Sequence, residues 1–157
     1  MNTLLATDSK TLQTLITEPI YLVQERINYS HFEYEGENNK YVLVITPDAL
    51  PTVEKEFLFK ILAAVKLSNT DIALLNFSVY PGADIHQLKK FFACSKIILF
   101  GVSPEQLGIK VKSANFSILE YLNMAILNAE SLTAIAPNQT KKTALWGALK
   151  QLFPANA

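Results

Sequence analysis

Short apolar runs alternate with amphipathic segments through the middle of the chain. Continuous runs of aliphatic and β-branched residues lie at 41–46, 71–77 and 96–101, and a loop follows each of them. Unbroken runs of this length are typical of strands buried on both faces of a parallel sheet. Between these runs, residues 51–67 and 83–92 carry apolar side chains at helical spacing. The order strand, helix, strand, helix predicts βαβ units.

This alternation predicts a three-layer α/β/α sandwich with a mainly parallel sheet of about four strands, because right-handed crossovers place helices on both faces. No repeat and no long linker divides the sequence, so we expect a single α/β domain over residues 1–157. Within it, an N-terminal segment (1–27) is expected to hold a short helix near 9–16 and a strand at 19–23.

Three other segments carry different patterns. Residues 30–40 are polar and turn-rich, which predicts an exposed loop or hairpin. Residues 115–127 fit either a strand at 116–119 that runs into a helix or one amphipathic helix. Residues 140–153 form a clearer amphipathic pattern, so they predict a C-terminal helix.

Composition indicates a packed globular protein. Half of the 157 residues are hydrophobic and 18% are charged, which suits a core that needs neither disulfides nor metals. Fourteen acidic and fourteen basic residues cancel, so charge does not favour direct binding to nucleic acid. No apolar run reaches the roughly 20 residues of a membrane span, and the first residues lack signal-peptide features. We therefore expect a cytoplasmic protein.

Ligands of open parallel sheets bind outside the carboxyl ends of the strands. The loops after Thr46, Phe77 and Gly101 are therefore where a site is expected. Their polar residues are Asp48, Tyr80, Asp84, His86, Ser103, Glu105 and Gln106. From these loops we take four candidate binding residues: Tyr80, Asp84, Ser103 and Pro104.

The sequence predicts no catalytic residue, no cofactor and no metal. Only His86 on that short list belongs to a residue type that commonly acts as a general base, and a partly exposed polar role at the start of a helix explains it as well. The five glycines form neither phosphate-binding fingerprint. Two histidines and one cysteine do not favour a metal site, and Cys94 is expected to be a small buried hydrophobe.

Residues 140–153, TKKTALWGALKQLF, resemble the terminal helix of the psi subunit of the bacterial DNA polymerase III clamp loader, which has a similar Ala-Leu-Trp core. Residues 41–76 are similar to that family's strand, acidic-proline loop, apolar helix and following strand. The loop is Asp48-Ala49-Leu50-Pro51 here. Together these segments cover about half of the chain.

The resemblance implies a non-catalytic accessory subunit that connects the clamp-loader ATPase to a chi partner, which in turn contacts single-stranded-DNA-binding protein. A protein partner, either chi-like or a clamp-loader subunit, is therefore expected. The family engages the clamp loader through an extended N-terminal peptide. The first 20 residues of this chain are partly helical in pattern and depart from it.

A second resemblance involves residues 96–106, KIILFGVSPEQ, which are similar to the strand and G-x-D-P loop of uracil-DNA glycosylases. Ser103 stands where that loop has its water-activating aspartate, and no later His-Pro-Ser segment is present. This implies a uracil-DNA glycosylase-like fold without base excision. The alternatives are an inactive or divergent glycosylase-like domain, or a small-ligand-binding domain of unknown role.

Trp146 is the fifth candidate binding residue. An indole on the apolar face of an amphipathic helix more often belongs to the core than to an interface, so we expect a core position. A contact with a partner is the alternative.

Overall fold

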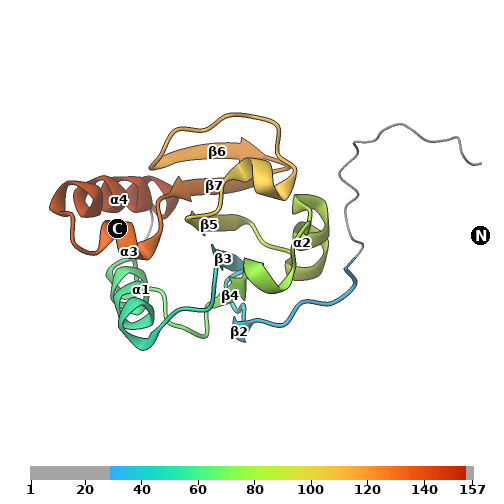
Figure 1. Cartoon of the computed structure of the whole chain (residues 1–157), viewed down its shortest axis with the longest axis horizontal. Coiled ribbons are helices and arrows are strands. Elements are labelled where there is room, and N and C mark those ends of the chain that lie inside the picture. The colour runs from blue at the N-terminus through green and yellow to red at the C-terminus, as the bar shows by residue number, and fades with distance from the viewer. Residues whose placement is uncertain (1–28, 155–157) are drawn as a thin grey trace, which may run out of the picture.

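A mixed sheet forms the middle of the protein, of which the computed structural model describes residues 29–154. Across this described part, the sheet has six strands, ordered in space as β2 (Glu35–Gly36), β4 (Ile72–Asn76), β3 (Val42–Thr46), β5 (Lys96–Phe100), β7 (Met124–Ala129) and β6 (Ser117–Tyr121) (Figure 1). The same residues form four helices: α1 (Thr52–Ala64), α2 (Ile85–Phe92), α3 (Leu132–Ile135) and α4 (Gln139–Leu152).

Strand direction differs between the middle and the edges of the sheet. The strands β4, β3, β5 and β7 run parallel, whereas β2 pairs antiparallel with β4 and β6 pairs antiparallel with β7. The expected mainly parallel sheet of about four strands is therefore wrong, because the sheet is mixed and two edge strands extend it. Both edge strands come from segments without an unbroken buried run.

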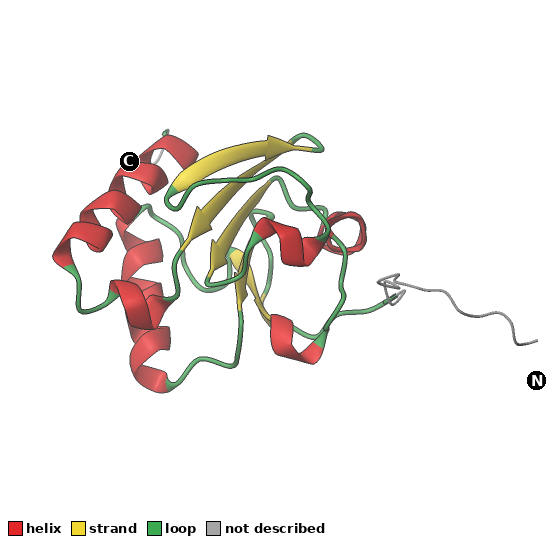
Figure 2. Ribbon diagram, turned by 45° about the horizontal axis from the view of Figure 1, so that its top comes forward, coloured by secondary structure: helices red, strands yellow, loops and turns green. Residues whose placement is uncertain are grey.

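Helices cover both faces of the sheet. Val44, Ile98 and Leu127 belong to the cluster beneath α1, α3 and α4. The neighbouring side chains Ile45 and Leu99 belong to the cluster beneath α2 and the 3-10 turn η3 (Pro104–Leu107). Adjacent residues of a strand point to opposite faces, so each of these strands contributes side chains to both clusters. Figure 2 shows the sheet between the two helical layers, as the alternation of the sequence predicts.

The four parallel strands follow a doubly wound order. The chain passes from β3 through α1 to β4 on one side, then crosses back through α2 to β5 on the other side of β3. If β3, β4, β5 and β7 are counted as the first to fourth parallel strands along the chain, their order in the sheet is 2-1-3-4. The direction of winding therefore reverses between β3 and β5, which is where such sheets open a crevice at their carboxyl ends.

Residues 115–127 contain the strand expected at 116–119, which is β6, but the expected helix is wrong because a second strand, β7, follows it. The strands β6 and β7 make an antiparallel hairpin whose two-residue loop is Leu122 and Asn123. Both loop residues have positive φ, 53° and 63°, as the commonest two-residue hairpin turns require. Because β7 is buried along nearly its whole length, its run MAILNA resembles part of a buried helix in sequence.

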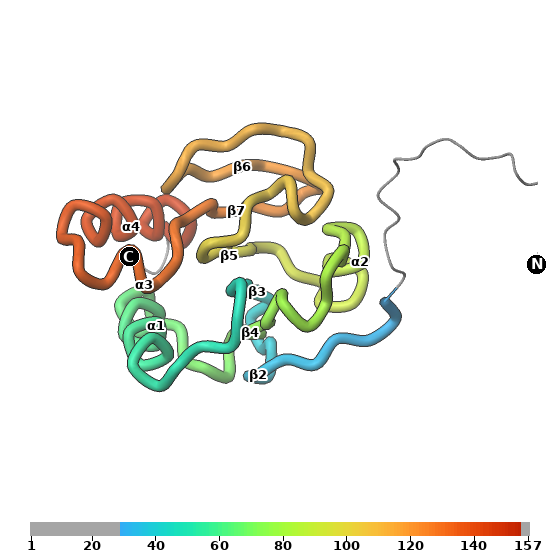
Figure 3. Tube along the Cα trace, in the orientation of Figure 1, coloured from blue at the N-terminus to red at the C-terminus, as the bar shows by residue number. Residues whose placement is uncertain are grey.

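The segment at 30–40 is not simply an exposed loop. Phe32 is fully buried, and its ring centroid lies 4.8 Å from that of Tyr80 and 5.4 Å from that of Phe91. The segment runs beside α2 before it reaches β2 (Figure 3). The expected exposure holds for most of the segment, and Phe32 is the exception, because this one aromatic side chain anchors an otherwise polar stretch.

The helix expected near 9–16 and the strand expected at 19–23 lie outside the described residues. Between residues 29 and 154, no helix has both the length and the apolar character needed to cross a membrane.

We predict that Phe32→Ala lowers the free energy of unfolding by about 3 to 5 kcal/mol, the usual cost of emptying an aromatic site in a core. Tyr34, two residues away and 39% exposed, is the matched control, and Tyr34→Ala should cost at most about 1 kcal/mol. Urea denaturation followed by circular dichroism measures both values. Equal losses for the two variants would contradict the anchoring role of Phe32.

Candidate functional site

A cleft of about 570 Å³ opens at the carboxyl ends of β5 and β7. Its walls come from residues 101–105 after β5, residues 112–115 before β6, and residues 128–131 at the end of β7. This β5–β7 cleft lies next to the point where the winding of the sheet reverses. A cavity therefore lies at the expected location, outside the carboxyl ends of parallel strands.

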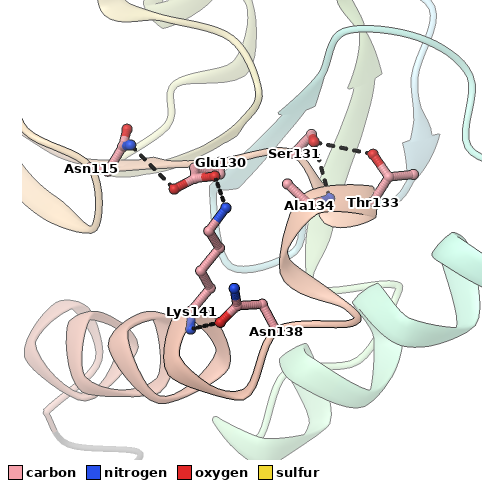
Figure 4. Close-up of polar contacts among 7 residues, drawn as sticks. All are labelled: Asn115, Glu130, Ser131, Thr133, Ala134, Asn138 and Lys141. Atoms are coloured by element: carbon pink, nitrogen blue, oxygen red, sulfur yellow. Dashed lines mark hydrogen bonds and ion pairs between the residues drawn. The ribbon is translucent and has the colours of Figure 1, made fainter.

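Glu130 ties together the walls of the β5–β7 cleft. Its Oε1 accepts a hydrogen bond from Nζ of Lys141 at 2.6 Å, and its Oε2 accepts one from Nδ2 of Asn115 at 3.3 Å (Figure 4). Asn138 caps α4 by accepting a hydrogen bond from the backbone N–H of Lys141. One carboxylate thus joins the end of β7 to the first turn of α4 and to the loop before β6.

Ser131 forms the next part of the wall and begins α3. Its Oγ accepts a hydrogen bond from the N–H of Ala134 at 3.3 Å and lies 3.1 Å from Oγ1 of Thr133 (Figure 4). Gly101 packs against it with a φ of +80°, and a Cβ on Gly101 would lie 3.0 Å from Cβ of Ser131 and 3.4 Å from Cγ of Pro47. The loops after β3, β5 and β7 can therefore meet only because residue 101 is glycine.

Asn128 is a buried polar residue of β7 that holds the opposite wall. Only 7% of it is exposed, and its Nδ2 donates to the backbone carbonyl of Ser113 at 3.1 Å. The amide thereby fixes the loop before β6, where Lys112 is exposed at the rim of the cleft. The lining offers hydroxyl, amide, carboxylate and ammonium groups, and it includes neither His nor Cys.

Ser103 and Pro104 lie in the β5–β7 cleft, as expected. Ser103 also begins η3, and Oε1 of Gln106 accepts hydrogen bonds from its backbone N–H at 2.9 Å and from its hydroxyl at 3.4 Å. Pro104 is buried in the first position of that turn. The hydroxyl of Ser103 therefore has a local structural partner within the cleft wall.

Tyr80 and Asp84 do not line this cleft. Tyr80 is 8% exposed, its ring packs edge-on against Tyr29 at 5.2 Å, and its hydroxyl accepts a hydrogen bond from the N–H of Glu33. Asp84 caps α2, where its Oδ1 accepts a hydrogen bond from the N–H of His86 at 2.7 Å and contacts Nδ1 of the same residue at 2.7 Å. Both residues have clear structural roles on the α2 side of the sheet.

Trp146 is not in the core. It is 37% exposed, whereas its neighbour Leu145 on α4 is 2% exposed. With Phe57, Ile61 and other residues of α1 and α4, it lines a groove of about 210 Å³. The expected core position is wrong because the sheet-facing stripe of α4 runs through residues 145, 148, 149 and 152, and residue 146 lies at its edge.

The sequence missed half of the cleft because it did not predict β7. Asn115, Asn128 and Glu130 belong to the loop before β6 and to the end of β7, and none of them was a candidate. A signal for them does exist, because the apolar run 124–127 gives way to the polar residues Asn128, Glu130 and Ser131. This is the same pattern that identified the ends of the other parallel strands.

Cys94 is buried, as expected. It is 3% exposed, and its Sγ lies 3.7 Å from Sδ of Met124. Burial raises the pKa of its thiol to about 11. The residues described contain no cluster of three or more side chains that could hold a metal ion.

No protein-family model matches the chain, and no relative is found among curated proteins. The structure itself defines the class: an α/β protein whose six-stranded mixed sheet, in the described residues, lies between two layers of helices.

We predict that Gly101→Ala destabilises the protein by about 2 kcal/mol or more, because it combines a left-handed backbone with a contact at 3.0 Å. Gly147, inside α4, is the control because a Cβ there meets nothing within 4 Å. Gly147→Ala should stabilise the protein by about 1 kcal/mol through helix propensity. Thermal and urea unfolding measure both changes, and a neutral Gly101→Ala variant would contradict the close approach of the three loops.

Proposed function

We propose that this protein is a non-catalytic accessory subunit, similar to the psi subunit of the DNA polymerase III clamp loader, that bridges protein partners at the replisome. The observation that carries this proposal is the position of Trp146. It is 37% exposed on the helix that carries the resemblance, and it lies in an apolar groove. Exposed apolar surface with an aromatic residue at its centre is typical of protein interfaces.

The two segments that resemble the psi family also meet in space. Residues 41–76 comprise β3, α1 and β4, and residues 140–153 comprise α4. The helices α1 and α4 lie on the same side of the sheet, and they line the groove together (Figure 1). The resemblance therefore concerns one surface of the molecule, which supports a shared role in binding a partner.

The same proposal includes a uracil-DNA glycosylase-like fold and a cytoplasmic location. Two observations support this fold: the parallel strands in the middle of the sheet, and the helices on both of its faces. The partner proposed is a chi-like protein or a clamp-loader subunit.

The proposal is tested by affinity purification of the tagged full chain from its own cells, followed by mass spectrometry. We expect recovery of a clamp-loader ATPase or a chi-like subunit, together with single-stranded-DNA-binding protein. Trp146→Ala should reduce this recovery by at least about tenfold if the indole is a hot spot. Gln151→Ala, an exposed position of α4 outside the groove lining, is the control. Wild-type protein that recovers no replication protein would contradict the proposal.

A divergent glycosylase-like or small-ligand-binding domain is the second candidate. It is favoured by the volume of the β5–β7 cleft, about 570 Å³, which falls within the usual range of ligand sites, and by the place of Ser103 in its wall.

Under the first proposal, the purified protein releases no uracil from single-stranded DNA, because Ser103 stands where the glycosylase loop has its aspartate. A fluorescence or gel assay at high protein concentration measures this. Release of uracil by the wild type, lost in Ser103→Ala, would replace the first proposal with the second.

A further inference from the structure

We propose that the groove between α1 and α4 binds an amphipathic helix of a partner protein, and that acidic residues flank the apolar stripe of that helix. The inference rests on the proposed function, because it identifies the kind of segment that the accessory subunit would bind. It is argued from the spacing, the burial and the charge of the groove residues.

Both walls of the groove are helical rows with the same spacing. On each helix the lining residues fall at positions i, i+3, i+4 and i+7, which share one helix face. They are Phe57, Lys60, Ile61 and Ala64 on α1, and Lys142, Leu145, Trp146 and Leu149 on α4. Two such rows side by side match the groove that a third helix fills through its own i, i+3, i+4 and i+7 side chains.

The depth of the groove varies in a way that suits inserted side chains. Leu145 and Leu149 are 2% and 0% exposed and form its floor. Trp146 lies beside them and is partly exposed. On the opposite wall Ala64 is exposed, and its side chain is only a methyl group. Apolar side chains of a partner would therefore contact buried leucines below and the indole at the side.

The positive charge around the groove determines which charge a partner helix should carry. Lys60 and Lys142 are the only charged residues in its lining, and Nζ of Lys150 lies 5.7 Å above the ring of Trp146. None of these three lysines forms an ion pair with another residue of the described part. The chain as a whole carries equal numbers of acidic and basic residues, so this is a local cluster of one sign.

Positive charge on the rim favours a partner with carboxylates on either side of its apolar stripe. The same charge disfavours a second copy of this chain. A symmetric dimer through the groove would place the lysines of one copy near the lysines of the other. A basic helix would meet the same repulsion.

Trp146 is the only tryptophan of the chain, so its emission reports on the groove in the unmodified full-length protein. The probes are two synthetic peptides with leucines at i, i+3, i+4 and i+7, one flanked by glutamates and the other by lysines. We expect the acidic peptide to shift the emission to the blue with saturation, as the indole loses water. We expect its affinity to fall as salt is added, since Lys60 and Lys150 are exposed and Lys142 is half-buried.

Charge reversal tests the role of the rim. Lys60→Glu combined with Lys142→Glu should weaken binding of the acidic peptide by at least about tenfold, a loss of about 1.4 kcal/mol. The same variant should strengthen binding of the basic peptide. Lys90→Glu, on the exposed side of α2 and across the sheet, is the matched control and should change neither affinity. Thermal unfolding confirms that each variant folds. Trp146→Phe removes the fluorophore, so its binding is measured by titration calorimetry, and it should retain most of the affinity for the acidic peptide.

Three results would overturn the proposal. The first is equal binding of the two peptides, or no saturable shift with the acidic one. The second is a dimer of the full chain that Trp146→Ala dissolves, which would make a second copy the occupant. The third is a free monomer whose Trp146 already emits like a fully buried indole and whose emission does not change when the acidic peptide is added. This result would mean that a segment of the chain itself occupies the groove.

The test also separates this inference from the proposed function. If the Lys60→Glu and Lys142→Glu double variant still recovers the replication proteins from cells, the accessory role holds and the groove is not its contact. If the acidic peptide binds but the chain recovers no replication protein, the groove has the proposed specificity and the replisome role is wrong.

Discussion

Burial of the parallel strands on both faces is the constraint on which the rest of the structure depends. The strands β3, β4 and β5 consist almost entirely of buried residues, and β7 is nearly as well covered. A strand of this kind exposes apolar surface on two sides unless each side is covered. The helices α1, α3 and α4 cover one face, and α2 with η3 covers the other. The two surfaces of interest are consequences of this arrangement, since the cleft lies where the strands end and the groove lies where two covering helices meet.

The sequence predicted the strands whose apolar run has a recognisable turn or loop at each end, and it missed β2 and β7. The strands at 42–46, 72–76 and 96–100 were expected because β-branched and aliphatic residues fill them. Edge strand β2 has only two residues, and β6 is half-buried, so neither carries a strong periodic signal. The hairpin turn at Leu122 and Asn123 lacks the glycine that usually marks such turns, and this hid the boundary between β6 and β7.

The candidate site was predicted in location and only partly in composition. The rule that ligands bind at carboxyl ends of parallel strands led to Ser103 and Pro104, because β5 was recognised. Asn128 and Glu130 escaped because they depend on β7. Tyr80 and Asp84 were polar residues of the correct kind of loop, but contacts with Glu33 and His86 give them structural roles that only the tertiary structure reveals. The error at Trp146 has a different cause. Helical periodicity predicted that its side chain packs in the core, but the stripe of α4 that packs against the sheet is too narrow to include it, so Trp146 lies at the edge of that stripe.

The two-residue turn of the β6–β7 hairpin has a consequence for how the molecule assembles. A hairpin forms on the microsecond scale, long before a parallel strand finds its neighbour through a long crossover. On these timescales we expect the turn to set the alignment of β7 before β7 docks on β5. A slip of one residue would reverse the faces of Ile126 and Leu127 and turn the amide of Asn128 away from Ser113. Leu122 and Asn123 line neither the β5–β7 cleft nor the groove between α1 and α4. They nevertheless determine the strand register of the C-terminal half of the fold.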